Sequence, residues 1–187
     1  MNAIAAAAAN WGIGLDNRLL FHISEDLRRF RALTAGGTLV MGRKTLDSLP
    51  GGRPLPGRRC VILTRDPAFD RPGAETARSP EEALALTAGE DPDRVWLCGG
   101  GEVYALLLPF CRTCRLTRVF AAPPCDAFFP DLDRLEQWRA VRREAVRTEG
   151  GLSFQFIDFV NSAPAVPPAS GHRSQADRRN DLPCRIY

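Results

Sequence analysis

The stretch Thr38-Leu39-Val40-Met41-Gly42-Arg43-Lys44-Thr45 joins a short apolar run to a glycine, two cations and a hydroxyl. An apolar run of this length without polar alternation is typical of a strand that is covered on both faces, as in a parallel sheet. The residues from Gly42 onward predict a brief helix that runs to about Leu49. A buried strand that leads directly into a helix indicates an α/β fold.

Strands and helices alternate on both sides of this stretch. The predicted strands are 2–9, 38–41, 60–63, 94–98 and 115–120, the predicted helices are 24–35, 43–49, 79–86 and 102–108, and residues 138–147 and 152–160 are predicted to form a closing β-hairpin. The sequence therefore predicts a single α/β domain over residues 1–161, with a mostly parallel central sheet, an antiparallel C-terminal hairpin and about four flanking helices. Residues 162–187 lack periodicity and are predicted to be a disordered tail that contains prolines and arginines.

Composition argues against several classes of protein. The net charge is +3, and residues 162–187 contribute +2 of it through four arginines and two aspartates, so we expect no basic face for nucleic acid. No apolar run is long enough to span a membrane, and the alanine-rich start lacks the basic residues of a signal peptide. Six cysteines in a chain with an ample core do not require disulfides, so we expect a reduced, cytoplasmic protein and, by default, a monomer.

One cysteine pair has the spacing of a metal or redox site. Cys111 and Cys114 could form half of a zinc site, but the chain has two histidines and no second pair at this spacing. We therefore interpret them as unlinked thiols and expect no metal.

The predicted helix at 24–35 places a carboxylate in an unusual position. Ser24 is predicted as its N-cap, with acids in the first turn. On a helical projection Asp26 falls inside the apolar stripe, which is formed by Ile23, Leu27, Phe30 and Leu33. A carboxylate on a buried face needs a partner or a function. Asp26 is thus a candidate functional acid; the alternative is an acid that caps its own helix or pairs with an arginine.

Residues suited to anions follow three of the predicted strands. These are Gly42-Arg43-Lys44-Thr45, Thr64-Arg65 behind Leu63, and Gly99-Gly100-Gly101. Each taken alone has a simpler interpretation, a tight turn for the glycines and solvated surface charge for the cations. Ligands of open α/β sheets bind at the carboxyl ends of strands, however, and clustered cations suit a dinucleotide with an extra 2′-phosphate. The three together predict NADPH.

In their order and spacing, these residues and several others resemble dihydrofolate reductase. The resemblance covers nearly all of residues 1–161 and rests on residues 4–6, 13–17, 25–30, 40–45, 52–58, 99–104, 116–117 and 129–131. It implies the NADPH-dependent reduction of 7,8-dihydrofolate to 5,6,7,8-tetrahydrofolate. One alternative is a related NADPH-dependent pterin or pyrimidine reductase, which would not require Asp26 or Arg58. The other is a non-catalytic nucleotide-binding paralogue, which would be expected to lose Asp26 or Thr117.

The resemblance also implies roles for individual residues. Asp26 matches the carboxylate that binds the amino group and ring N–H of the pterin, and Thr117 matches the hydroxyl that supports it. Arg58 matches the cation that pairs with the α-carboxylate of the folate glutamate. The catalytic set is completed by Leu19 and Phe21, and the remaining substrate contacts would come from Ile4, Ala5, Leu27, Phe30, Leu49, Leu55 and Cys98.

For the cofactor, the resemblance implies a mobile loop at about residues 10–20 and a glycine turn whose Gly-Gly peptide is usually cis in the family. The implied contacts of NADPH are Ala6, Ile13, Gly14, Leu19, Gly42, Arg43, Lys44, Thr45, Leu63, Thr64, Arg65, Cys98, Gly99, Gly100, Gly101, Glu102, Val103 and Tyr104. The chain departs from the family at Phe21, where a tryptophan is usual, and at Cys98, where isoleucine or valine is usual. A phenylalanine has no N–H, so a water held by that indole would need another partner.

Overall fold

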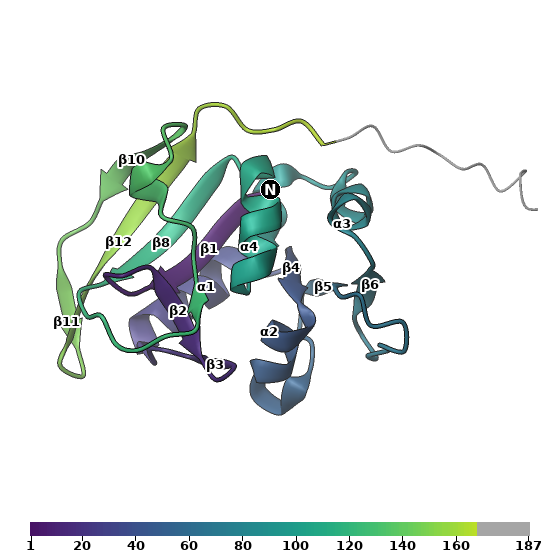
Figure 1. Ribbon diagram of the computed structural model, residues 1–187, viewed down its shortest axis with the longest axis horizontal. Coiled ribbons are helices and arrows are strands. Elements are labelled where there is room, and N and C mark those ends of the chain that lie inside the picture. The colour runs from purple at the N-terminus through teal and green to yellow at the C-terminus, as the bar shows by residue number, and fades with distance from the viewer. Residues whose placement is uncertain (168–187) are drawn as a thin grey trace, which may run out of the picture.

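The computed structural model describes residues 1–167, in which nine strands form the main sheet and three form a small one (Figure 1). The main sheet contains β1 (Asn2–Ala7), β4 (Thr38–Gly42), β5 (Arg59–Leu63), β6 (Glu75–Ala77), β7 (Val95–Leu97), β8 (Thr113–Val119), β10 (Trp138–Arg143), β11 (Arg147–Glu149) and β12 (Leu152–Asn161). Its order is β10-β12-β8-β1-β7-β4-β5-β6, and β11 also pairs with β12. The strands from β8 to β6 are parallel, whereas β10, β11 and β12 are antiparallel to their neighbours. The predicted fold class is confirmed.

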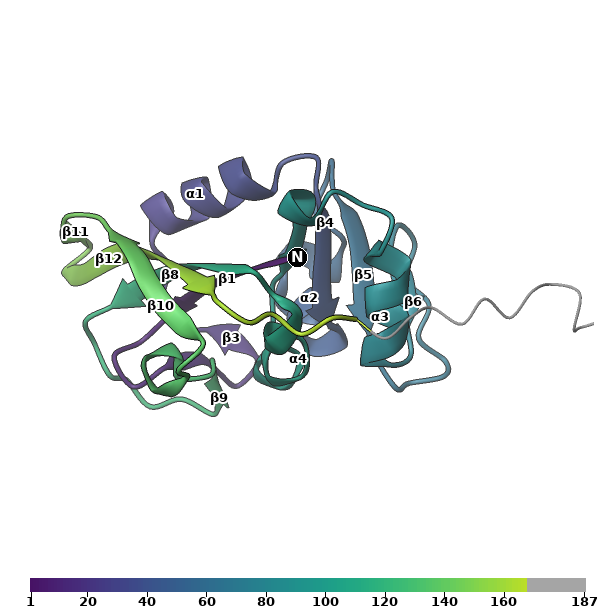
Figure 2. The same ribbon diagram turned by 90° about the horizontal axis from the view of Figure 1, so that it is seen from above.

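The two faces of the sheet carry separate hydrophobic cores, because successive side chains of a strand point to opposite sides. Val40 and Val61 belong to the larger core, which also contains residues of α3 (Pro80–Thr87) and α4 (Gly101–Leu107). Met41 and Ile62 belong to the second core, which contains Leu46 of α2 (Arg43–Ser48) and against which Phe30 of α1 (Ser24–Thr34) packs. Figure 2 shows α1 and α4 on opposite sides of the sheet.

The small sheet forms where the sequence predicts only loops. It consists of β3 (Arg18–Leu19), β2 (Gly12–Leu15) and β9 (Ala127–Phe128), in that order. β1 ends at Ala7, two residues earlier than predicted, because Ala8 begins a turn in which its N–H donates to the carbonyl of Gly12 at 2.8 Å. The small sheet thus ties residues 12–19 to the segment before Phe129.

Two local predictions are wrong, and one strand is absent from the predictions. Ser24 is the first residue of α1 rather than its N-cap, and the N-cap position is held by Ile23. Leu33 is 36% exposed, so the apolar stripe ends one turn earlier than the projection suggests. The edge strand β6 was not predicted, because three residues with a single buried side chain give no periodic signal.

The segment after β12 is described as far as residue 167. The Ser162 N–H donates to the carbonyl of Gln137 at 2.8 Å, and the Ala165 N–H donates to the carbonyl of Pro109 at 2.9 Å. The rest of the predicted tail, residues 168–187, lies outside the described residues. None of the helices in residues 1–167 is both long and apolar enough to cross a membrane.

Candidate active site

Asp26 on α1 and Thr117 on β8 meet across the face of the sheet. The Thr117 hydroxyl donates to Asp26 Oδ1 at 2.6 Å, and Thr117 is buried. Burial raises the pKa of Asp26 above its ordinary value, while the hydroxyl and the nearby Arg29 act in the opposite direction. The carboxylate that the helical pattern singled out is therefore a largely desolvated acid with one short hydrogen bond.

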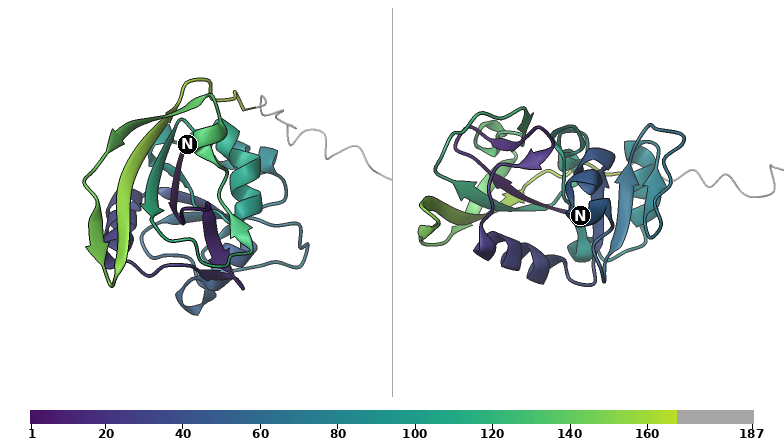
Figure 3. Two further views of the ribbon diagram at one scale, coloured as in Figure 1. Left: turned by 60° about the vertical axis from the view of Figure 1, so that its left-hand side comes forward. Right: turned by 90° about the horizontal axis from the view of Figure 1, so that it is seen from below.

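The first turn of α1 is held by a residue distant in sequence. Ile23 has no polar side chain to act as a cap, and the carboxylate of Glu149 at the end of β11 takes this role. It accepts from the Ser24 N–H at 2.6 Å and from the Glu25 N–H at 3.1 Å. Figure 3 shows the hairpin of β11 and β12 beside the start of α1. An anion at a helix N-terminus is favourable, and these bonds lower the pKa of Glu149. Nothing local in the sequence pointed to Glu149.

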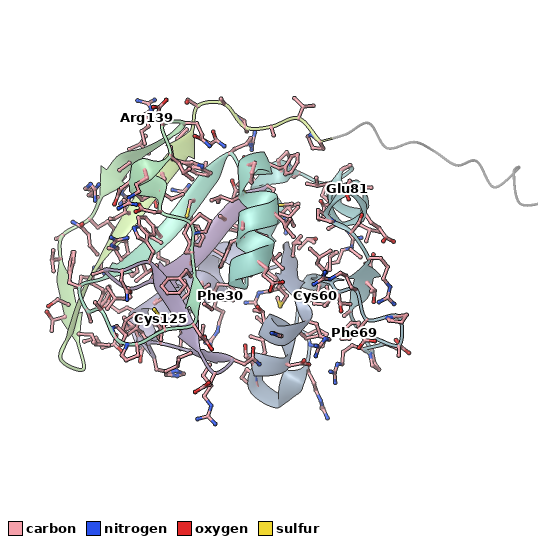
Figure 4. All side chains as sticks on the ribbon, viewed as in Figure 1. Phe30, Cys60, Phe69, Glu81, Cys125 and Arg139 are labelled. Atoms are coloured by element: carbon pink, nitrogen blue, oxygen red, sulfur yellow. The ribbon has the colours of Figure 1, made fainter. Side chains whose placement is uncertain are left out.

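The predicted apolar contacts gather in the second core, next to Asp26. Phe30, Leu49, Leu55 and Cys98 are partly buried and pack against a cluster that includes Ile4. Phe30 and the buried Cys60 of this core are labelled in Figure 4. Leu27 is half-buried and directly follows Asp26, whereas Ala5 is buried in the larger core on the other face of the sheet. The structure thus places the Asp26 carboxylate beside a set of apolar side chains that are only partly buried.

Arg58 lies at the opposite end of α1 from Asp26. Its Nε donates to the Thr34 hydroxyl at 3.0 Å, and its guanidinium carbon lies 5.9 Å from the centroid of the Phe30 ring. The Thr34 hydroxyl in turn donates to the carbonyl of Phe30 at 2.8 Å. Thr34 was missed from the sequence, since a threonine in a last helical turn usually bonds only its own backbone. Here it also orients the arginine.

The three predicted anion-binding segments converge at the carboxyl ends of β4, β5 and β7. The Gly42 N–H donates to the carbonyl of Gly99 at 2.7 Å, and the Gly99–Gly100 peptide is cis. A Cβ on Gly100 would lie 3.4 Å from Thr45 Oγ1, so the glycine turn lies against the start of α2. The helices α2 and α4 both begin here behind glycines, which have no side chain to cap their first N–H groups.

The cations at these strand ends differ in how they are paired. Arg43 Nη1 lies 3.1 Å from Asp47 Oδ2, one turn further along α2. Within residues 1–167 neither Lys44 nor Arg65 forms an ion pair. Thr64 is buried, and its hydroxyl accepts from the Asp66 N–H at 3.2 Å. Two uncommitted cations and two helix N-termini suit the phosphates of a dinucleotide, so the residues present fit NADPH.

Tyr104 and Val103 support this turn from α4. The Tyr104 hydroxyl donates to the carbonyl of Ile4 at 2.6 Å, and its ring packs edge-on against Phe129 with 4.6 Å between centroids. A Cβ on Gly42 would lie 3.0 Å from Val103 Cγ2. Glu102, in contrast, is exposed and has no hydrogen bond or ion pair from its side chain in the part of the chain that the structure describes.

The loop implied by the resemblance leaves β1 and passes through the small sheet. Ile13 and Gly14 lie on β2, where the Gly14 carbonyl accepts from the Asp126 N–H at 3.0 Å. Leu19 on β3 is 65% exposed. Phe21 packs against a third cluster, formed by Ile23, Val119, Phe154 and Phe156.

No group of three potential metal ligands occurs within residues 1–167. Cys60, Cys98, Cys111, Cys114 and Cys125 are free thiols. Burial raises the pKa of Cys111 to about 12, which keeps this thiol protonated and unreactive.

Comparison with known proteins gives one consistent result. The sequence profile described as Dihydrofolate reductase matches residues 1–161. The dihydrofolate reductase of Neisseria meningitidis serogroup A is 41% identical over 157 residues, which cover 84% of this chain and 95% of that protein. The enzyme of that name from Mycobacterium tuberculosis is 41% identical over 163 residues, with coverages of 85% and 96%.

A solved structure agrees with these sequence matches. Dihydrofolate reductase from Enterococcus faecalis, complexed with NADP(H) and RAB-propyl, superposes with a TM-score of 0.77 at 29% identity. The match covers 86% of this chain and 95% of that one.

Proposed function

This chain belongs to the dihydrofolate reductase family and reduces 7,8-dihydrofolate with NADPH, and we propose that Asp26 and Thr117 are the polar groups that bind and protonate the pterin. The observation that supports this assignment is the 2.6 Å bond between the two side chains beside an apolar wall. Asp26 is the carboxylate of α1 that faces the sheet, whereas its neighbour Glu25 pairs with Arg147 at the surface.

A buried carboxylate is suited to one edge of the pterin. Its two oxygens can accept from the amino group and from the adjacent ring N–H, as charge-assisted hydrogen bonds. This pairing favours the tautomer in which the ring nitrogen N5 can take a proton. Because burial raises the pKa of Asp26 above its ordinary value, the group can also exchange a proton at a higher pH than an exposed aspartate.

The cofactor supplies a hydride to carbon C6 of the pterin when it is bound. We assign its phosphates to Lys44, Arg65, Thr45 and the glycine turn at 99–101, for the reasons of charge and geometry given above. Arg43 reaches this region while paired with Asp47. The remaining contacts implied by the resemblance, among them Ala6, Ile13, Gly14, Leu63, Cys98 and Tyr104, are part of the same proposal.

At the other end of the substrate, Arg58 is proposed to bind the glutamate carboxylate. Within the described residues, its Nη atoms make only long bonds to carbonyls, of 3.3 Å to Pro56 and 3.4 Å to Arg31. The guanidinium is therefore oriented through Nε and Thr34 while its two-pronged edge can still receive a carboxylate. Phe30, Leu49 and Leu55 would enclose the aminobenzoyl ring between the two ends.

Thr117→Val tests the pairing of hydroxyl and carboxylate. The hydroxyl stabilises the ionised form of Asp26, so its removal should raise the pKa of Asp26 further. We expect the midpoint of the pH dependence of kcat/KM for dihydrofolate to rise in the same direction. Thr117→Ser keeps the hydroxyl and should leave the midpoint in place. An equal midpoint in all three proteins would contradict the assignment.

We also propose that residues 1–161 form the complete catalytic domain. Deletion of residues 168–187 is expected to leave kcat and the melting temperature unchanged. A chain that ends at Asn161 also loses the bonds of Ser162 and Ala165, each contributing about 1 kcal/mol, so its melting temperature should fall by a few degrees. Calorimetry of the full chain and of the two shortened chains measures these melting temperatures. A loss of activity on deletion of residues 168–187 would contradict the proposal.

The oligomeric state and location belong to the same proposal. We propose a monomeric, cytoplasmic enzyme. The five free thiols of the described residues suit a reducing compartment, and the site above draws all of its residues from one chain.

A further inference from the structure

A buried carboxylate lies between two guanidiniums beneath α1. The side chain of Asp158 on β12 is 9% exposed. Its Oδ1 lies 2.8 Å from Arg29 Nη2, and its Oδ2 lies 2.5 Å from Arg115 Nη1. Arg115 and Asp158 are register partners on β8 and β12, so the sheet fixes both of them. Arg29 reaches them from α1.

This cluster and the Asp26–Thr117 pair share one face of the sheet. Arg115 and Thr117 are two residues apart on β8 and therefore point to the same side. Asp26 and Arg29 are three residues apart on α1 and therefore lie on neighbouring turns of one helix face. The Arg29 guanidinium carbon also lies 4.5 Å from the ring centroid of Phe156, the register partner of Thr117. The helix is thus tied to the sheet at two successive points.

We propose that Arg29, held by Asp158, is a positioning residue that fixes α1 and a positive charge one turn from Asp26, and so sets the pH range of the reductase. The inference rests on the proposed role of Asp26. A cation near a carboxylate favours its ionised form. The attraction of Arg29 accordingly lowers the pKa of Asp26, in opposition to the larger effect of burial.

Among the described residues, Arg29 is the cation near Asp26, and the other groups around that carboxylate are neutral. Thr117 faces it from β8 as a neutral hydroxyl. Tyr104 approaches from α4, but burial raises the pKa of that phenol well above its ordinary value, so it stays neutral. On its outer side Arg29 borders a surface pocket, which is also lined by Glu25, Arg28, Glu144 and Arg147. These four side chains border Arg29 at the surface, and Arg29 is the charged group that acts on Asp26.

The test is the pH dependence of hydride transfer in single turnovers of the full chain with NADPH and dihydrofolate. Arg29→Met keeps the length of the side chain and removes its charge. We expect the midpoint of the profile to rise by about half a pH unit or more. Arg29→Lys retains the charge and should restore a midpoint close to that of the wild type.

Arg28→Met is the matched control. Arg28 is adjacent on the same helix and is exposed, and its removal changes the net charge by the same amount. Its midpoint is expected to remain at the wild-type value. If Arg29→Met does not fold, Arg29→Met/Asp158→Asn removes both partners of the ion pair. The midpoint should still rise, since the charge of Arg29, and not that of Asp158, acts on Asp26.

Two outcomes would overturn the inference. In one, Arg29→Met lowers the rate by the same factor at every pH and leaves the midpoint unmoved, which is the mark of a purely structural role. In the other, Arg28→Met shifts the midpoint as much as Arg29→Met does. Failure of the Asp26 proposal looks different, because Asp26→Asn would then retain the titration step of the wild type.

Discussion

Asp26→Asn is expected to lower kcat/KM for dihydrofolate at pH 7 by about 100-fold or more, the usual scale of a lost proton-transfer group. The amide can still contact Thr117, but it offers one acceptor oxygen in place of two and exchanges no proton. At low pH the substrate arrives already protonated at N5, so the loss should shrink as the pH falls. The measurement is the decay of NADPH absorbance across pH. Wild-type rates in the variant at pH 7 would refute the role of Asp26.

The same variant should not be less stable than the wild type at pH 7. Burial raises the pKa of Asp26 above its value in the unfolded chain, so the folded state binds this proton more tightly. Stability from this group is then fully present below the unfolded pKa and is lost as the pH rises through the folded pKa. At neutral pH the charged form is a cost to folding, which asparagine removes. We expect an equal or higher melting temperature, which separates lost chemistry from lost structure.

Gly99→Ala is expected to weaken NADPH binding by about 10-fold or more and to lower the melting temperature. Gly99 has a φ of +100°, which L side chains rarely adopt, and the strain of such a residue is about 1–3 kcal/mol. Its Cβ would also lie 2.6 Å from Cε2 of the Tyr104 ring. Moving that ring disturbs the bond to Ile4 and the contact of Gly99 with Gly42. Titration of NADPH by fluorescence without substrate measures the effect.

Gly89→Ala provides the matched control for this substitution. Gly89 follows α3, has no positive φ, and a Cβ there would meet nothing within 4 Å. Its NADPH affinity and melting temperature should equal those of the wild type. An unchanged dissociation constant in Gly99→Ala would show that the glycine turn does not bind the cofactor.

The parts of this site that were predictable depend on periodic or local patterns. The buried strand at 38–41 and the acid at 26 on an apolar helix face are visible in the residues themselves, and the structure confirms their placement. The glycines and cations that directly follow the predicted strands are visible in the same way, and they indicate where the phosphates of the cofactor bind. The resemblance to the family then supplied partners that no local pattern contains, such as Thr117 for Asp26.

What could not be predicted are contacts between segments far apart in the chain. Glu149 accepts from the Ser24 N–H, 125 residues away in sequence, and Asp158 pairs with Arg29, 129 residues away. Both residues lie on strands at the antiparallel end of the sheet, where a charged side chain is ordinarily read as solvent-facing. The local sequence predicts Ser24 as the cap because its side chain suits that position, but the carboxylate of Glu149 accepts from the first N–H groups of the helix instead.

The anchoring of α1 at both ends has a consequence for the length of its ligand. Glu149 and Asp158 fix the first half of the helix to β11 and β12, while Thr34 holds Arg58 at its last turn. Asp26 and Thr34 are eight residues apart, which is about 12 Å of helix. The helix thus sets the distance between the carboxylate that binds one end of the substrate and the guanidinium that binds the other. A pterin without the aminobenzoyl spacer can bind Asp26 but does not reach Arg58.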